Sequence, residues 1–369
     1  MTDSVKVIWV RVPDDTNAFT IFETLNDRGL SLAITDLLKN HLFGLAGNRL
    51  REVQAAWVGM VSALEGLEEE NVVLTFLRHY WSSKYGLVRE KDLYAGIKKR
   101  VNNQSRAASF AAELERNAHI YAAIVNTTDA FWAKYGDSCR EHMEVINTLR
   151  MIQIRPLILS VLDNFKDADA KAAIRNMVSW SVRFLIHGGL GSGGIETHNC
   201  QAAKAIRDKD ITSASKLYKR LKTVIPNDAQ FRSSFLAASV SKAYLARYYL
   251  RAMEQQERGG SDPELVPNAN AEVINLEHVL PQTLSPAWSH ISADEHLLLF
   301  KRLGNLAIMR EKINTKAGND GFTFKRAFYA KSEYRLTSGI ASEAKWDRQA
   351  IDRRQGHMAD LALKTWPLK

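Results

Sequence analysis

Apolar residues recur at intervals of three and four positions through most of this chain, from about residue 50 to residue 256. One such series is Val53, Trp57, Met60 and Leu64. This spacing places apolar side chains on one face of an α-helix. The pattern therefore predicts a largely helical middle region and, within it, a single helix from Phe231 to Met253.

The first residues follow a different pattern. Val5–Val12 is rich in β-branched residues and is followed by Pro13-Asp14-Asp15, which predicts a strand with a defined end. A strand without partners leaves its backbone hydrogen-bonding groups unpaired. We therefore expect residues 1–48 to be the C-terminal remnant of a larger α/β domain.

Two glycine-rich stretches interrupt the helical pattern. His187–Gly194 lacks the Lys-Ser/Thr pair and the preceding strand of a phosphate-binding loop, so it predicts a connection between helices. Arg258–Pro263 combines glycine, proline and polar residues, which is typical of a linker. Beyond it, apolar runs at 273–276 and 303–309 predict two strands, and helices are expected near 321–331 and 346–366. This order of elements predicts a ββα unit.

The fold class expected from these patterns is mainly α. It comprises an α/β remnant at 1–48, a helical domain at 49–257, a linker at 258–270 and a small C-terminal α+β domain at 271–369.

Composition narrows the classes of protein. The net charge of +9 favours polyanionic partners, because neutralised phosphates release condensed counterions. Two cysteines cannot form a four-thiolate zinc site, and a single long-range disulfide is not expected in a reducing compartment. No uncharged apolar run approaches the roughly 20 residues needed to span a bilayer. These features predict a cytoplasmic protein without a membrane segment.

The C-terminal region contains residue types suited to phosphodiester hydrolysis. That reaction needs a base for water and a cation at the scissile phosphate. Histidine titrates near neutrality, and carboxylate and amide oxygens suit Mg²⁺. The region supplies Glu277, His278, Asn305 and Asn314.

These residues lie in motifs that resemble a known family. The motifs are Glu277-His278-Val279-Leu280-Pro281-Gln282, then Leu303-Gly304-Asn305-Leu306, Asn314, Phe324 and Lys325. They resemble the C-terminal nuclease region of GmrSD-type, modification-dependent (type IV) restriction endonucleases. The resemblance implies an HNH-like, or His-Me finger, ββα-metal domain.

The N-terminal residues resemble the same family. The runs Ile21–Leu30 and Asp36–Asn40 are similar to the end of its nucleotide-hydrolysing domain. The Asp-Gly-Gln-Gln-Arg signature of that domain is absent, so we expect a fragment or a split subunit. Nucleoside triphosphate is then a cofactor only when a separate or upstream N-terminal part is supplied. Asn26, Arg28 and Gly29 are weak candidates for the nucleotide pocket, and a packing role is the alternative.

Transferred by position, the resemblance assigns a role to each candidate. His278 would be the general base, and Asn305 would hold the loop that carries it. Asn314 would bind the metal, with Glu277 as a second ligand or its neighbour, and Lys325 would contact phosphate or the leaving group. The simpler alternatives are a turn at Asn305, a helix cap at Asn314 and a solvated charge at Lys325.

Basic residues surround the motifs and suit a phosphate track, or alternatively a solvated face. The aromatic residues among them, Phe324 included, are expected to form the core of the small domain. The candidates for contact with DNA are Arg302, Arg310, Lys312, Lys316, Arg326 and Lys331.

The resemblance, together with the residue types of the C-terminal region, implies a DNA endonuclease dependent on Mg²⁺ or Mn²⁺. Its substrate would be foreign double-stranded DNA, and the resemblance suggests glucosylated hydroxymethylcytosine as the modification. The protein could act as a homodimer. The alternatives are a catalytically idle helical DNA-binding or regulatory fragment, and a nucleotide-sensing partner of a separate N-terminal chain.

Overall fold

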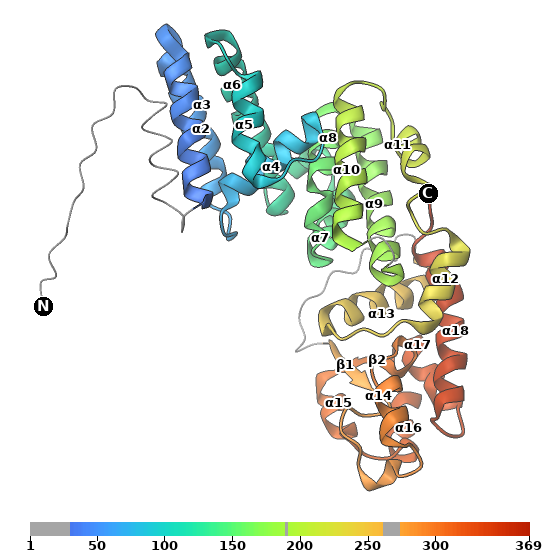
Figure 1. Ribbon diagram of the computed structural model, residues 1–369. Helices are drawn as coiled ribbons and strands as arrows, with labels where there is room; N and C mark the ends of the chain where they lie inside the picture. Colours follow the sequence, from blue (N-terminus) through green and yellow to red (C-terminus); the bar gives the residue numbers. More distant parts are fainter. Residues whose placement is uncertain (1–29, 189–190, 261–273) are drawn as a thin grey trace, which may run out of the picture. The chain divides into compact units, whose positions relative to one another are not determined.

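The computed structural model describes residues 30–188, 191–260 and 274–369 (Figure 1). The expected strand Val5–Val12 and the candidates Asn26, Arg28 and Gly29 lie outside these residues. The chain forms two compact units, Met1–Asn126 and Thr127–Lys369.

The described part of the first unit is helical. Its elements are α2 (Leu30–Ala46), η1 (Gly47–Arg49), α3 (Leu50–Glu65), α4 (Val72–Tyr85), α5 (Glu90–Arg100) and α6 (Gln104–Val125). Helix α3 packs along α6, and α2 packs against both. The series Val53, Trp57, Met60 and Leu64 is buried on one face of α3, which confirms the predicted helical face.

The second unit begins with further helices. They are η2 (Ala130–Lys134), α7 (Asp137–Thr148), η3 (Ile152–Ile154), α8 (Arg155–Asn164), α9 (Asp167–His187), α10 (Gly191–Arg207), α11 (Ala214–Leu221), α12 (Asp228–Ala237) and α13 (Ala243–Glu257). The prediction that the whole glycine-rich stretch His187–Gly194 connects two helices is wrong, because α9 extends to His187 and α10 already begins at Gly191.

The prediction of one helix from Phe231 to Met253 is wrong. Helix α12 ends at Ala237 and α13 begins at Ala243. Between them Ser239 forms a β-bridge with Arg302, and the Val240 amide donates to the Lys301 carbonyl at 2.9 Å. Pairing with a distant segment satisfies these backbone groups outside a helix, which the local sequence pattern does not reveal.

The C-terminal elements confirm the predicted two-stranded arrangement in a mainly helical protein. They are β1 (Ile274–His278), η4 (Pro286–Trp288), α14 (Ala293–Leu299), η5 (Leu303–Asn305), β2 (Leu306–Arg310), α15 (Glu311–Ala317), α16 (Phe322–Ala330), α17 (Arg335–Ser338), η6 (Gly339–Ser342) and α18 (Arg348–Thr365). The strands are antiparallel, with Ile274 opposite Arg310 and His278 opposite Leu306.

The compact units differ from the expected domain boundaries. Helix α12 packs on α18, and α13 packs on α18 and on both strands. Because these helices cover the elements that follow residue 270, the segment 258–270 does not divide two compact units. The first unit, in turn, ends at Asn126, within the region expected to be one helical domain.

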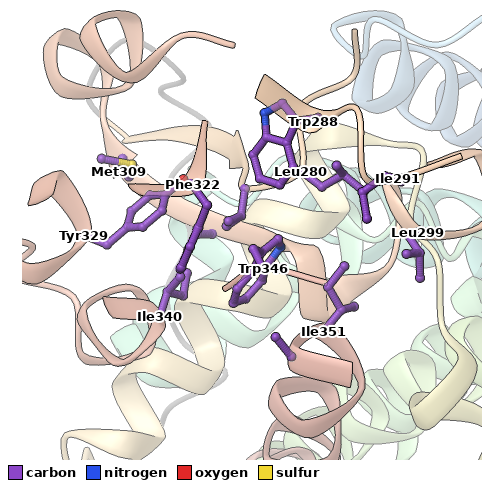
Figure 2. Packing of buried hydrophobic residues seen from close by; sticks show 13 residues of the cluster. Leu280, Trp288, Ile291, Leu299, Met309, Phe322, Tyr329, Ile340, Trp346 and Ile351 are labelled. Carbon is purple, nitrogen blue, oxygen red and sulfur yellow. The ribbon is translucent and has the colours of Figure 1, made fainter. Parts of the chain in front are cut away.

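A cluster of buried apolar residues supports the C-terminal elements (Figure 2). The rings of Phe322 and Trp346 are stacked with centroids 5.5 Å apart, and Trp288 is fully buried in the same cluster. Each large aromatic side chain removes about 150–250 Å² from water. The expectation that Phe324 belongs to this core is wrong, because its side chain is 51% exposed.

Gly304 allows η5 to pack closely on α18. A Cβ at this position would lie 2.5 Å from the Ile351 carbonyl oxygen and 2.9 Å from Cβ of Gln355. Neither neighbour is the flexible end of a side chain, so the backbone would have to move. We expect Gly304→Ala to lower the free energy of unfolding by about 1–3 kcal/mol, measured by urea denaturation.

Gly356 provides the matched control, because it lies in α18 and a Cβ added there would have no neighbour within 4 Å. Gly356→Ala should stabilise the helix by up to about 1 kcal/mol. Equal effects of the two substitutions would contradict the close approach at Gly304.

Two further expectations concern the described residues. Cys139 and Cys200 are both buried free thiols. Among the described helices, none has both the length and the apolar character needed to cross a lipid bilayer.

Candidate active site

A cavity of about 320 Å³ lies where β1 ends and meets α15. His278 and Asn314 both line it, together with Gln282 and Asn319. The fold brings these residues together because Asn314 Nδ2 donates to the Leu276 carbonyl at 3.2 Å, which holds α15 against β1. The structure therefore places residues 278 and 314, which are expected to share one site, on the wall of one cavity.

The imidazole of His278 is half-buried, and its pKa is lowered to about 4. Burial is the main cause, and the positive charges of Lys325 and Lys301 add to it. At neutral pH the ring is therefore uncharged, and one of its two nitrogens is a hydrogen-bond acceptor. The Gln282 amide nitrogen lies 3.2 Å from Nε2 and 3.4 Å from Nδ1. One amide nitrogen cannot lie in line with both ring nitrogens, so this contact does not fix the tautomer.

Asn305 is fully buried and its side chain holds the loop that follows His278. Its Oδ1 accepts from the Leu280 amide at 2.8 Å, and its Nδ2 donates to the Leu280 carbonyl at 2.9 Å. Oδ1 also accepts from Trp346 Nε1, and Nδ2 also donates to the Phe300 carbonyl. These four hydrogen bonds occupy both the oxygen and the nitrogen of the side-chain amide. Asn305 therefore holds the loop in place and does not contact a substrate.

Lys325 and Glu277 form a buried ion pair at the wall of the cavity. Lys325 Nζ donates to Glu277 Oε1 at 2.9 Å and to the carbonyls of His278 and Val279 at 3.0 and 3.3 Å. Tyr329 donates to the same carboxylate oxygen at 2.6 Å. Burial raises the pKa of Glu277, against the opposing effects of Lys325 and Tyr329.

This arrangement differs from the roles expected for both residues. Lys325 is fully buried with three acceptors, so its ammonium is not available to a phosphate. Glu277 also borders the cavity, but it is only 5% exposed and its Oε1 accepts hydrogen bonds from Lys325 and Tyr329. The pair instead ties α16 to the end of β1.

The cavity offers few ligands for a divalent cation. Among the described residues, no group of three or more His, Cys, Asp and Glu side chains is arranged to hold a metal. Asn314 retains a free amide oxygen, since its hydrogen bond to Leu276 uses the nitrogen. This amide oxygen could supply one ligand to Mg²⁺, whose remaining ligands would have to be waters and oxygens of a substrate phosphate.

The basic candidates differ in how far they are committed to other contacts. The Arg302 guanidinium donates to Gln355 Oε1 and the Leu236 carbonyl, and Arg310 forms a bidentate pair with Glu333 at 2.7 and 2.8 Å. Arg326 donates to the Ala341 carbonyl at 2.7 Å. Contacts within the protein therefore account for the positions of these three arginines without a phosphate ligand.

Three lysines remain accessible. Lys312 and Lys316 are exposed on α15, the helix that carries Asn314, and have no ion pair within the described part of the chain. Lys331 is exposed at the end of α16, beside a separate cavity at Arg310. Lys312 and Lys316 are therefore the basic candidates whose helix borders the active-site cavity.

Sequence reasoning missed several residues that shape the site. Gln282 is the last residue of the motif Glu277–Gln282, and the sequence assigns it no role, although its side chain contacts the His278 ring. Lys301 lowers the pKa of His278, and Tyr329 binds Glu277. Only Gln282, four residues after the histidine, could have been found from its spacing. The other two approach through the tertiary fold.

Residues 225–361 match the family model described as "GmrSD restriction endonucleases, C-terminal domain". The matched region contains α12, α13, both strands and the whole cavity. No curated protein matches the chain.

Proposed function

We propose that the chain is a Mg²⁺-dependent DNA endonuclease with an HNH-type active site at His278, because residues 225–361 match the C-terminal domain of GmrSD restriction endonucleases. The observation that carries this proposal is the position of His278 on the wall of a cavity that it shares with Asn314, and burial lowers the pKa of its imidazole to about 4.

In this proposal His278 accepts the proton of the attacking water. Asn305 fixes the backbone of Leu280, and Lys325 fixes the carbonyls of His278 and Val279. Both are positioning residues, since they hold the imidazole in place without touching the substrate. The Asn314 amide oxygen would hold the cation, which when bound supplies charge stabilisation at the scissile phosphate.

The proposed substrate is foreign double-stranded DNA in the cytoplasm, with modified cytosine as the recognised feature. Lys312 and Lys316 would lie along its backbone, because both are exposed on the helix that carries Asn314. A separate nucleotide-hydrolysing part would act with this chain in the complete restriction system, either as single copies or as a dimer.

One observation favours the alternative of an idle DNA-binding or regulatory fragment. Glu277 is the only acidic residue that lines the described cavity, and its Oε1 already accepts hydrogen bonds from Lys325 and Tyr329. A site with so few oxygen donors would bind a divalent ion weakly unless substrate phosphate completes it.

Cleavage of supercoiled plasmid distinguishes the two functions. The full chain would be incubated with modified and unmodified plasmid in Mg²⁺, in Mn²⁺ and in EDTA, and a His278→Ala sample purified in parallel would reveal contaminating nuclease. We expect nicking or linearisation only with a divalent ion. Binding of plasmid without cleavage under every condition would favour the regulatory fragment and overturn the nuclease proposal.

A further inference from the structure

The first compact unit contains a separate cavity of about 650 Å³. It lies where the C-terminal ends of α4 and α5 meet the first turn of α6. Its lining includes Lys84, Lys99, Arg100, Arg106 and one acidic residue, Glu113. We propose that this cavity binds the phosphate groups of a nucleic acid strand or a nucleotide.

Most of the positive charge in this cavity is not neutralised. Lys84 is paired with Glu113. Lys99, Arg100 and Arg106 are exposed and have no acidic partner among the residues that the structure describes. Three uncompensated cations around one concave surface attract a multiply charged anion.

Helix stability accounts for only part of this cluster. Cations in the last turn of α5 are favourable, because they face the negative end of the helix dipole, and this explains Lys99 and Arg100. Arg106 lies in the first turn of α6, where the dipole disfavours a cation. Its NH1 group donates to the Arg100 carbonyl at the end of α5, so the remaining N–H groups of Arg106 are the ones left for a ligand.

The two arginines are oriented by contacts that leave donors available. The Arg100 guanidinium stacks over the Tyr85 ring, 4.3 Å from the ring centroid. Arg106 uses only its NH1 group in hydrogen bonds, to the Arg100 carbonyl and the Asn102 side chain. A guanidinium held with its other N–H groups free can bind two phosphate oxygens at once.

The size and surroundings of the cavity also suit a phosphate ester. Its volume falls within the roughly 300–1,000 Å³ of small-molecule sites, and Ser105 and Ser109 add hydroxyl donors to the lining. The acidic residues Glu65 and Glu68–Glu70 lie before α4, roughly 20 Å away along that helix. This acidic run therefore does not neutralise the cations of the cavity. None of this depends on the chemistry proposed for His278.

The test compares two charge-matched variants of the full chain. One is Lys99→Gln/Arg100→Gln/Arg106→Gln. The control is Arg51→Gln/Arg89→Gln/Lys91→Gln, three exposed cations of the same unit that do not line the cavity. Fluorescence anisotropy would measure binding of a labelled 20-base-pair duplex, a labelled single strand and a fluorescent ATP analogue. EDTA would prevent cleavage, and the salt concentration would be varied.

We expect the cavity variant to lose at least tenfold in affinity for one of these probes, while the control stays close to wild type. If the probe is DNA, the slope of log K against log salt should fall by about two to three. Loss confined to the ATP analogue would identify a free nucleotide as the ligand, and loss confined to DNA would identify the strand. Equal losses in both variants, or none in either, would overturn the proposal.

A single substitution keeps the proposal testable if the triple variant does not fold. Lys99 has no hydrogen bond or ion pair with other described residues, so Lys99→Glu should leave the fold intact. Circular dichroism would confirm this. A correctly folded Lys99→Glu protein with unchanged affinity for all probes would likewise contradict the site.

Discussion

His278→Ala is expected to lower the rate of DNA cleavage about 10²–10⁴-fold, the usual contribution of a general base. The imidazole is uncharged at neutral pH, because burial and the charges of Lys325 and Lys301 lower its pKa to about 4. Alanine removes the proton acceptor while leaving β1 and the loop contacts of Asn305 unchanged. Single-turnover cleavage in Mg²⁺, with enzyme in excess over labelled DNA, would measure the chemical step.

His290→Ala is the matched control for this prediction. His290 is exposed, stacks on Trp288 with ring centroids 5.8 Å apart, and does not line the cavity. It should cleave at close to the wild-type rate. DNA affinity in EDTA should be similar for wild type and both variants, since a neutral ring does not neutralise phosphate. Cleavage by His278→Ala at the wild-type rate would exclude this histidine as the base.

Lys325→Met is expected to lower the free energy of unfolding by about 3–5 kcal/mol, because it leaves a buried carboxylate without its cation. Lys325 and Glu277 are both buried, and the ammonium also satisfies the carbonyls of His278 and Val279. The loop that carries the base should loosen at the same time. Urea denaturation followed by tryptophan fluorescence would measure the loss.

Glu277→Gln in the Lys325→Met background tests the cause of that loss. Removal of both charges should recover part of the stability, with a coupling of about 0.5–3 kcal/mol between the two positions. Lys316→Met, on the exposed face of α15, should change stability by no more than about 0.5 kcal/mol. An effect at Lys325 as small as at Lys316, or strict additivity of the two buried substitutions, would contradict a positioning role for the pair.

Roles within the site were predictable only in part. His278, Asn305 and Asn314 were identified from residue type and motif, and the structure brings His278 and Asn314 to one cavity with Asn305 behind the loop. For Lys325 and Glu277 the motif indicates a functional role, but the expected contacts with phosphate and metal differ from the buried ion pair that the two residues form. Their motif positions do not say whether a side chain points toward the cavity or into the core.

The sequence by itself determined the helical class, the two strands and the order of elements around residue 278, because periodicity of apolar residues and breaks at glycine and proline are local properties. Only the tertiary structure decided that residues 231–253 form two helices, that α12 and α13 pack on the C-terminal elements, and that Lys325 is buried against Glu277. Each of these three features depends on contacts between segments far apart in the chain. The local periodicity of apolar residues does not reveal which distant segments will meet.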